Sequence, residues 1–337
     1  MKTYTRRDAL KAGLATVATT ALAGAPLGRA WAAYPERNLK VVIPTAPGGG
    51  ADRLARAFSD TWRKMLGAAL EFDFFPGGAG QVGYEVYTSR RDKDAYNLLF
   101  GNMGPETLMY VLQQPKYKFP GDYFYFCRID IDDSVVYVRT QSPFRRVEDL
   151  VAEAKKRTVT VGVSRLPHPA SIGVLALGDA TGAKFNLVPY GGGNPTSVAV
   201  LNGEVDCGAL PIAEPIRLGE KARVLGVFND TNRLADRSAD APPVNKVFGT
   251  KIPSLYSSRA WAIHSEAAAK YPDRFQKLNQ TAKEVFADPA FKDLYEKTAG
   301  DWRQAAYGDR AACTEYTEAM IELGNRYREL LTAKKKS

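Results

Sequence analysis

The sequence predicts an α/β protein of two lobes, with a helix-flanked sheet in each lobe and a hinged cleft between them. Short β-type runs alternate with segments of helical periodicity, which is the pattern of parallel sheets. The length of 337 residues exceeds what one compact core usually holds, so two lobes are expected. Hydrophobic residues make up 45% and charged residues 25%, which is typical of a globular protein and not of a disordered one.

Strands are expected where apolar and β-branched residues gather in short runs. Ten such runs follow one another: LKVVIPT, EFDFF, YNLLFGN, FYFCRID, SVVYVRT, VTVGVS, FNLVPY, VDCGALP, RVLGVFN and AWAIHS. Helical spacing follows the first run and places four apolar side chains on one face: Leu54, Phe58, Trp62 and Met65. Near the end of the chain we expect two long helices, at 266–287 and 308–331.

The division into lobes is expected where the chain changes character. Residues 134–144, SVVYVRTQSPF, form a long strand-like run that can leave one sheet and begin another region. Residues 232–254 are rich in Pro and Asp, and their segment ADAPP is incompatible with regular structure, so they predict the return loop. The expected lobes are 34–134 with 245–337, and 135–244.

The N-terminus has the features of an export signal. Arg6 and Arg7 precede an apolar run at 12–27, and a triplet of the A-x-A type follows at 30–32. The apolar run is shorter than the roughly 20 residues that span a bilayer. Residues 1–32 are therefore predicted to be a twin-arginine-type signal peptide that is removed in the periplasm. The alternative is a buried N-terminal helix.

The net charge and its distribution indicate which kind of partner the protein binds. The formal net charge is +9, and residues 1–32 carry +4 of it from five basic residues against one acidic residue. The rest of the chain is mildly positive and has no block of Lys and Arg interleaved with aromatic residues, so we do not expect nucleic acid as a partner. A mild positive field suits a small anionic ligand.

Cysteine and histidine are too scarce and too scattered for a metal site. The candidates are Cys127, Cys207, Cys313, His168 and His264, with no C-x-x-C spacing among them. We expect neither a metal nor a cofactor. Buried free thiols are favoured over a disulfide, although an exported protein could form one.

Four glycine-bearing turns, each between a strand and a helix, are the candidate ligand-binding elements. They occupy 44–52, 75–83, 162–171 and 189–197. In open α/β sheets, ligands bind outside the carboxyl ends of the strands, where the free amides and the positive ends of helices attract an oxyanion. Glycine allows a close backbone approach and positive φ. In the last turn, Asn194 is expected as an N-cap before Pro195.

Nucleotide binding and nucleophilic catalysis are both disfavoured by context. GAGQVG matches G-x-G-x-x-G, but no acidic residue ends the next strand to hold a ribose, and PGGGADR lacks the G-K-[ST] of a P-loop. Ser164 or Ser171 could pair with His168, but there is no G-x-S-x-G elbow and no acid at a telling spacing. We therefore expect a binding protein and not an enzyme.

In combination these motifs resemble the periplasmic solute-binding receptors of tripartite tricarboxylate transporters, of the Bug or TctC type. YPERNLKVVIPTAPGGGAD is similar to the family's Tyr-Pro start and its strand ending Pro-Phe-Ala-Pro-Gly-Gly-Gly-x-Asp. FPGGAGQVG resembles the family's Arg-Pro-Gly-Ala-Gly-Gly turn, and DAYNLLFGNMG its Asp-Gly-Tyr-Thr-Leu-Leu segment. VPYGGGNPT, followed by GEVD, resembles its Val-Pro-Tyr-Lys-Gly-Gly turn and Gly-x-Val-Asp. The likeness runs in order over most of residues 34–300.

The resemblance implies a two-lobe periplasmic-binding-protein fold of type II that closes on an anion, often a dicarboxylate or an aromatic acid. It implies a receptor, expected to be monomeric, that passes a small carboxylate to the integral-membrane subunits of a transporter. Three departures remove bulk or charge near the site: Thr45 for an aromatic residue, Phe75 for Arg and Gly191 for Lys.

Carried over by position, the resemblance implies ligand contacts from both lobes. The implied residues are Pro47, Gly48, Gly49, Gly50, Asp52, Gly77, Gly78, Ala79, Gly80, Asn102, Ser164, His168, Ser171, Tyr190, Gly191, Gly192, Asn194 and Asp206.

Two questions stay open at this stage. A periplasmic hydrolase or a sensor co-receptor could use the same cleft. The anion could be held by backbone amides, in which case Gly49, with an expected positive φ, would be essential and Arg53 dispensable; alternatively, Arg53 could contact the anion directly.

Overall fold

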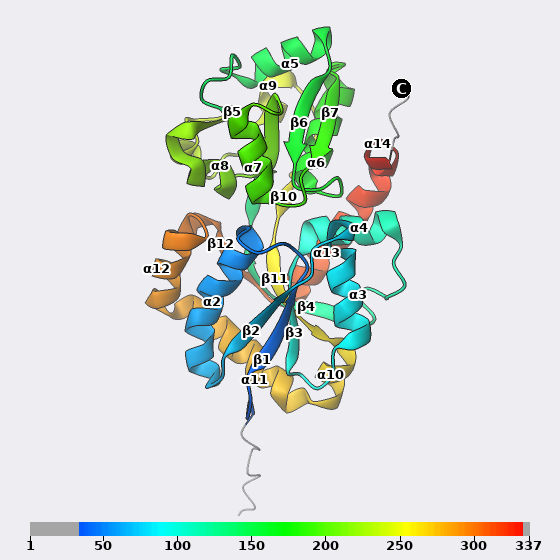
Figure 1. The fold of residues 1–337 in the computed structure, drawn as a ribbon, viewed down its shortest axis with the longest axis vertical. Coiled ribbons are helices and arrows are strands. Elements are labelled where there is room, and N and C mark those ends of the chain that lie inside the picture. The colour runs from blue at the N-terminus through cyan, green and yellow to red at the C-terminus, as the bar shows by residue number, and fades with distance from the viewer. Residues whose placement is uncertain (1–33, 333–337) are drawn as a thin grey trace, which may run out of the picture.

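The computed structural model describes residues 34–332, which form two lobes stacked along the long axis of the molecule (Figure 1). The predicted signal peptide, residues 1–32, lies outside the described residues. Within 34–332, no helix is long and apolar enough to cross a membrane. Each lobe has one sheet with helices on both faces, which confirms the predicted fold class.

The sheet of the first lobe combines strands from both ends of the chain. Its order is β12–β4–β11–β3–β1–β2, with β1 at Leu39–Ile43, β2 at Leu70–Phe74, β3 at Asn97–Asn102, β4 at Tyr123–Asp130, β11 at Arg259–His264 and β12 at Ala305–Gly308. β1 is parallel to β2 and β3, whereas β11 lies antiparallel between β3 and β4. The sheet is therefore mixed and not purely parallel as predicted, because β11 enters from the other lobe.

Alternating side chains of β1 serve two cores on opposite faces of this sheet. Val41 packs with Phe58 and Trp62 of α2, and Val42 packs on the other face with Tyr84 of α3. The helices of the first lobe are α2 (Gly50–Leu66), α3 (Gln81–Arg90), α4 (Met103–Gln113), α10 (Ser265–Lys270), α11 (Pro272–Glu284), α12 (Pro289–Thr298) and α13 (Arg310–Arg326).

The second lobe has its own sheet, in the order β10–β5–β8–β6–β7, with β9 also paired to β5. Its strands are β5 (Asp132–Arg139), β6 (Val159–Val163), β7 (Phe185–Pro189), β8 (Cys207–Pro211), β9 (Ala222–Val227) and β10 (Tyr256–Ser257). Its helices are α5 (Val147–Lys156), α6 (Pro169–Thr181), α7 (Gly193–Asn202), α8 (Ala213–Leu218) and α9 (Val244–Phe248). The short C-terminal helix α14 (Arg328–Thr332) packs against α6.

Two adjacent strand connections join the lobes. β4 continues into β5 through Ile131, and β10 continues into β11 through Ser258. The buried Arg259 guanidinium pairs there with the carboxylates of Asp130 and Asp132, and its Nη2 lies 3.1 Å from Asp132 Oδ2. Burial raises the pKa of Asp132 to about 6, although Arg259 opposes the shift. An ion cluster therefore lies between the two crossing strands.

All ten predicted strand runs form strands, but two predicted helices are interrupted. The segment 266–287 divides at Tyr271, because Pro272 begins α11 and cannot continue α10. The segment 308–331 divides between α13 and α14. The three cysteines are buried and free. The predicted lobe boundaries stay a prediction.

Candidate functional site

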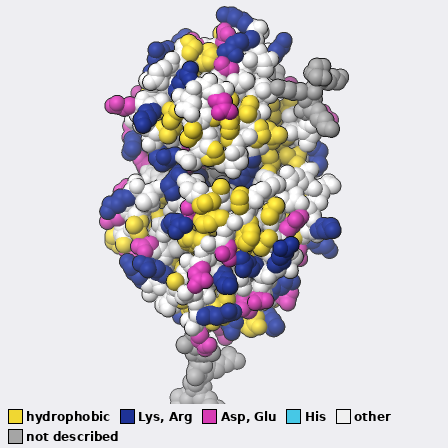
Figure 2. Space-filling view, viewed as in Figure 1, with side chains coloured by type: hydrophobic (Ala, Val, Ile, Leu, Met, Phe, Trp, Pro, Cys, Tyr) yellow, Lys and Arg dark blue, Asp and Glu magenta, His cyan; other side chains and the backbone are white. Residues whose placement is uncertain are grey.

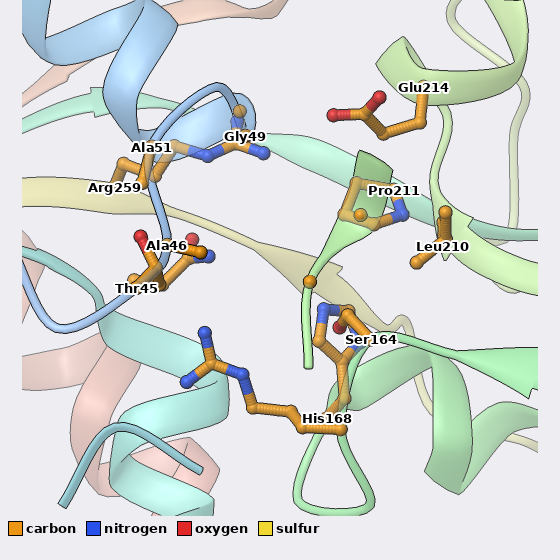
Figure 3. Close-up of a pocket in the computed structure, with 15 residues that line it drawn as sticks. Thr45, Ala46, Gly49, Ala51, Ser164, His168, Leu210, Pro211, Glu214 and Arg259 are labelled. Atoms are coloured by element: carbon orange, nitrogen blue, oxygen red, sulfur yellow. The ribbon is translucent and has the colours of Figure 1, made fainter. Parts of the chain in front are cut away.

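A small cavity lies between the lobes, where loops at the carboxyl ends of strands face one another (Figure 3). Its volume is about 50 Å³. Six residues predicted as ligand-binding line it: Gly49, Gly50, Asn102, Ser164, His168 and Gly192. In Figure 2 the surface is hollowed along the boundary between the lobes, with Lys and Arg side chains beside the hollow. The cavity therefore lies where the fold predicts a ligand, outside the ends of the strands.

Four helices begin at this cavity, two from each lobe. They are α2, α4, α6 and α7, and their N-caps are Gly49, Asn102, His168 and Gly192. The first amides of a helix have no intrahelical acceptor and carry its positive end. Within the described chain, the amides of Gly50 and Ala51 have no acceptor. The arrangement thus directs several partial positive charges toward one small space.

The loop before α2 is shaped by its own side chains. The Gly48 amide donates to Asp52 Oδ2 at 2.8 Å, and Asp52 Oδ1 accepts from Arg56 Nε at 2.6 Å. The positive φ expected at Gly49 is wrong: φ is +79° at Gly48 and −81° at Gly49. Asp52 therefore holds the loop and does not line the cavity.

His168 is a neutral hydrogen-bonding group at the start of α6. Its Nδ1 accepts from the Ala170 amide at 3.0 Å, so the proton of the neutral ring lies on Nε2, 3.5 Å from Ser257 Oγ. Burial, with Arg165 and Arg259 nearby, lowers the pKa of His168 to about 3. Its Nε2–H group is therefore a donor, and the ring is a poor base.

Two arginines reach across the boundary between the lobes. Arg53 of α2 donates through Nη2 to Glu214 Oε1 of α8 at 2.6 Å; their side chains are 19% and 4% exposed. Arg165, in the loop after β6, donates to the Ala79 carbonyl oxygen at 2.7 Å and lies 3.7 Å from Glu106 Oε1. These contacts hold the two lobes together on either side of the cavity.

Glu106 belongs to a buried polar cluster in the first lobe. Its Oε2 accepts from the Tyr84 hydroxyl at 2.5 Å, and that hydroxyl also bonds the Tyr125 hydroxyl. Burial raises the pKa of Glu106 to about 7, although Arg165 lowers it. The cluster therefore connects a titratable group to a contact between the lobes.

The remaining predicted residues lie near the cavity or away from it, but do not line it. They are Pro47, Gly48, Asp52, Gly77, Gly78, Ala79, Gly80, Ser171, Tyr190, Gly191, Asn194 and Asp206. The turn with Ala79 contacts Arg165 instead, and the Ser171 hydroxyl donates to the Arg165 carbonyl oxygen at 3.1 Å. Both therefore position Arg165. The Tyr190 hydroxyl donates to Glu204 at 2.7 Å.

Asp206 precedes β8, at the end of that strand opposite the cavity. It pairs with Arg157 at 2.8 Å and accepts from the Thr160 amide. Burial opposes its ionisation, but the bonds from Arg157 and Thr160 lower the pKa of Asp206 to about 2. The expected N-cap Asn194 is also wrong, because α7 begins at Gly193 after the N-cap Gly192.

Three charged residues that were not predicted as ligand-binding also line the cavity: Arg165, Glu214 and Arg259. Each follows or precedes an apolar strand run, and an isolated charge in that position was the available signal. Three more lining positions, Thr45, Ala46 and Ala51, belong to the first glycine turn or its helix.

Comparison with known proteins assigns the chain to a family. A family described as "Tripartite tricarboxylate transporter family receptor" matches residues 54–309. The chain belongs to this family. The resemblance drawn from the motifs is therefore confirmed, and the protein is a tripartite tricarboxylate transporter receptor.

Relatives of this receptor are similar over most of its length. It is 28% identical over 259 residues to a protein from the TAR-I ttuE-ttuC' intergenic region of Agrobacterium vitis, covering 76% of this chain and 73% of the relative. It is 26% identical over 237 residues to Protein BugT of Bordetella pertussis, covering 68% and 71%.

Solved structures share the fold of this receptor. Periplasmic binding protein BugD has a TM-score of 0.76 at 17% identity, covering 88% of this chain and 98% of that one. A Rhodopseudomonas palustris protein with adipate has a TM-score of 0.76 at 20% identity, with the same coverage. MatC of Rhodopseudomonas palustris, with bound malate, has a TM-score of 0.73 at 17% identity and covers 88% and 100%.

Proposed function

We propose that this receptor captures a small carboxylate in the cavity between its lobes and delivers it to the integral-membrane subunits of a tripartite transporter. The observation that carries the proposal is the convergence of four helix amino ends on one cavity lined from both lobes. Such ends favour an oxyanion without a dedicated lysine. The malate and adipate in the similar structures are carboxylates, which supports this ligand class.

Donors suited to a carboxylate lie on both sides of the cavity. The first lobe offers the Thr45 hydroxyl, which has no partner within the described chain, and the second offers His168 Nε2–H and the Ser164 hydroxyl. A ligand that accepts from both sets contacts both lobes only when they are close together. Binding is therefore expected to shift the population toward the closed form.

Catalysis is not part of the proposal. A hydrolase would need an activated nucleophile, but His168 commits Nδ1 to the Ala170 amide, and its pKa of about 3 makes it a weak base. Within 34–332, no group of three or more His, Cys, Asp or Glu is placed to hold a metal ion. We propose a receptor that works without a cofactor, as a monomer.

Export to the periplasm completes the proposal. It rests on residues 1–32, whose paired arginines, apolar run and small-residue triplet have the pattern of a removable signal. We propose 34–134 with 245–337 as one lobe and 135–244 as the other.

Calorimetry on the purified mature receptor, with a panel of small mono- and dicarboxylates, tests the function. We expect one-to-one binding heat, recovery of the ligand unchanged after long incubation, and compaction in small-angle scattering at saturation. Chemical turnover of a bound carboxylate would favour the hydrolase, and binding of no carboxylate would contradict the proposal.

A further inference from the structure

Glu214 brings a carboxylate of the protein itself to the cavity. It is the second residue of α8, its side chain is 4% exposed, and it lines the cavity. Burial opposes its ionisation, but Arg53 and Arg217 lower the pKa of Glu214, so the group is a carboxylate at neutral pH. Among the described residues that line this cavity, it is the only acidic one.

The carboxylate of Glu214 lies at the start of two helices at once. A Cβ added to Gly50, the first residue of α2, would lie 3.3 Å from Glu214 Oε1. A Cβ added to Gly193, the first residue of α7, would also lie 3.3 Å from that oxygen. The two glycines therefore leave room for this oxygen where a helix end attracts an anion.

The cations that pair with Glu214 approach from outside the cavity. Arg53 donates to Oε1 at 2.6 Å and Arg217 to Oε2 at 3.0 Å. Both arginines line a separate surface groove beside α2 and α12, and neither lines the cavity. Glu214 therefore stands between these two positive charges and the ligand. The Arg259 guanidinium also lines the cavity near Gly50, but its charge is already paired with Asp130 and Asp132.

The opposite side of the cavity carries side chains that can donate hydrogen bonds to a carboxylate. The Thr45 hydroxyl is buried and has no hydrogen-bond partner within the described chain, so it can donate to a ligand carboxylate. His168, which lies across the cavity from Glu214 in Figure 3, and Arg165 also line the cavity. One end of the cavity thus accepts a carboxylate, while the end formed by α2 and α7 is already occupied by Glu214.

We propose that Glu214 is a specificity-determining residue that restricts this receptor to small monocarboxylates and excludes dicarboxylates of the same length. The inference rests on the proposed function and narrows its ligand class. A second ligand carboxylate would lie against Glu214 in a site from which most water is excluded, where like charges repel strongly. The cavity volume of about 50 Å³ also suits a ligand of few heavy atoms.

The test compares ligands that match in shape and differ by one charge. Malonate and succinate are each compared with their half-amides, malonamate and succinamate, by calorimetry at neutral pH on the mature wild-type receptor, the Glu214→Gln variant and the control Glu220→Gln. Glu220 is an exposed residue of the same lobe that lies outside the cavity. Circular dichroism and thermal melting establish that each variant is folded.

We expect the wild type and Glu220→Gln to bind a half-amide at least 100-fold more tightly than its dicarboxylate. In Glu214→Gln this ratio should fall at least tenfold, because the glutamine amide is uncharged and can donate a hydrogen bond to the second carboxylate. Equal or tighter binding of dicarboxylates by the wild type would overturn the inference and leave the proposed function standing. So would an unchanged ratio in folded Glu214→Gln. If the wild type bound neither member of any pair nor any other small carboxylate, the inference about Glu214 and the proposed function would both be contradicted.

Discussion

The substitution Glu106→Gln should change how the stability of the receptor depends on pH. The Glu106 side chain is 1% exposed, and its Oε1 has no hydrogen-bond partner among the residues that the structure describes. Arg165 Nη1 lies 3.7 Å away, which is too far for a hydrogen bond. Burial therefore dominates and raises the pKa of this carboxyl from 4.5 to about 7.

The sign follows from the protons that each state holds. Above about pH 4.5 the unfolded chain releases the Glu106 proton, whereas the folded chain keeps it until about pH 7. The free energy of unfolding therefore falls as pH rises through this window, and the loss from this group between about pH 5 and pH 8 is about 2–3 kcal/mol. Glutamine carries no titrating proton, so Glu106→Gln lacks this loss.

Urea unfolding of the wild type and Glu106→Gln at several pH values between about 5 and 8 measures the effect. As pH rises, the unfolding free energy of the variant should increase relative to that of the wild type. Glu318→Gln, which removes an exposed carboxyl of α13, is the matched control for the same chemical change outside the buried cluster. A flat difference for Glu106→Gln, or one that moves in favour of the wild type, would refute the reasoning; the latter would mean that the ionised pair with Arg165 outweighs burial.

Three further outcomes are expected. Gly50→Val should weaken carboxylate binding more than tenfold in calorimetry, because its Cβ would lie 3.1 Å from a guanidinium nitrogen in the cavity, whereas Gly49→Ala, with only one contact at 3.7 Å, should bind normally. Arg53→Ala should also lose more than tenfold in affinity and open the lobes in small-angle scattering, because it removes the contact with Glu214; unchanged values would show that this contact does not hold the closed form. Replacing both arginines at 6–7 by lysine should leave uncleaved precursor in the cell on immunoblots, and normal processing would instead indicate the general secretory route.

The strands and most of the helix starts could be predicted because their signals are local. Apolar runs bounded by Gly and Pro located the strands, and strand–glycine–helix turns located the amino ends of α2, α6 and α7. What glycine does at a given position was less predictable. Gly48 has the positive φ, while Gly50 and Gly193 make room for Glu214, which depends on a side chain far away in the sequence.

The charged contacts of the site could not be predicted, because they also join side chains that lie far apart in the sequence. Arg53 meets Glu214 across 161 positions of sequence, and Arg165 meets Ala79 across 86. No local pattern specifies such pairs, which form only when the lobes approach each other. Arg53 was therefore expected to be either dispensable for binding or a direct partner of the ligand, and in the structure it instead pairs with Glu214.

The position of β11 in the first sheet has a consequence for how the chain folds. β3 and β4 are not neighbours, because β11 lies between them and pairs with both. Before residues 259–264 are available, β3 has one unpaired edge, and β4 has two because its other partner, β12, also comes later in the chain. Residues 132–257, by contrast, already contain every strand of the second sheet. A chain that stops before residue 259 should therefore aggregate through the open edges of β3 and β4, even with its second lobe folded.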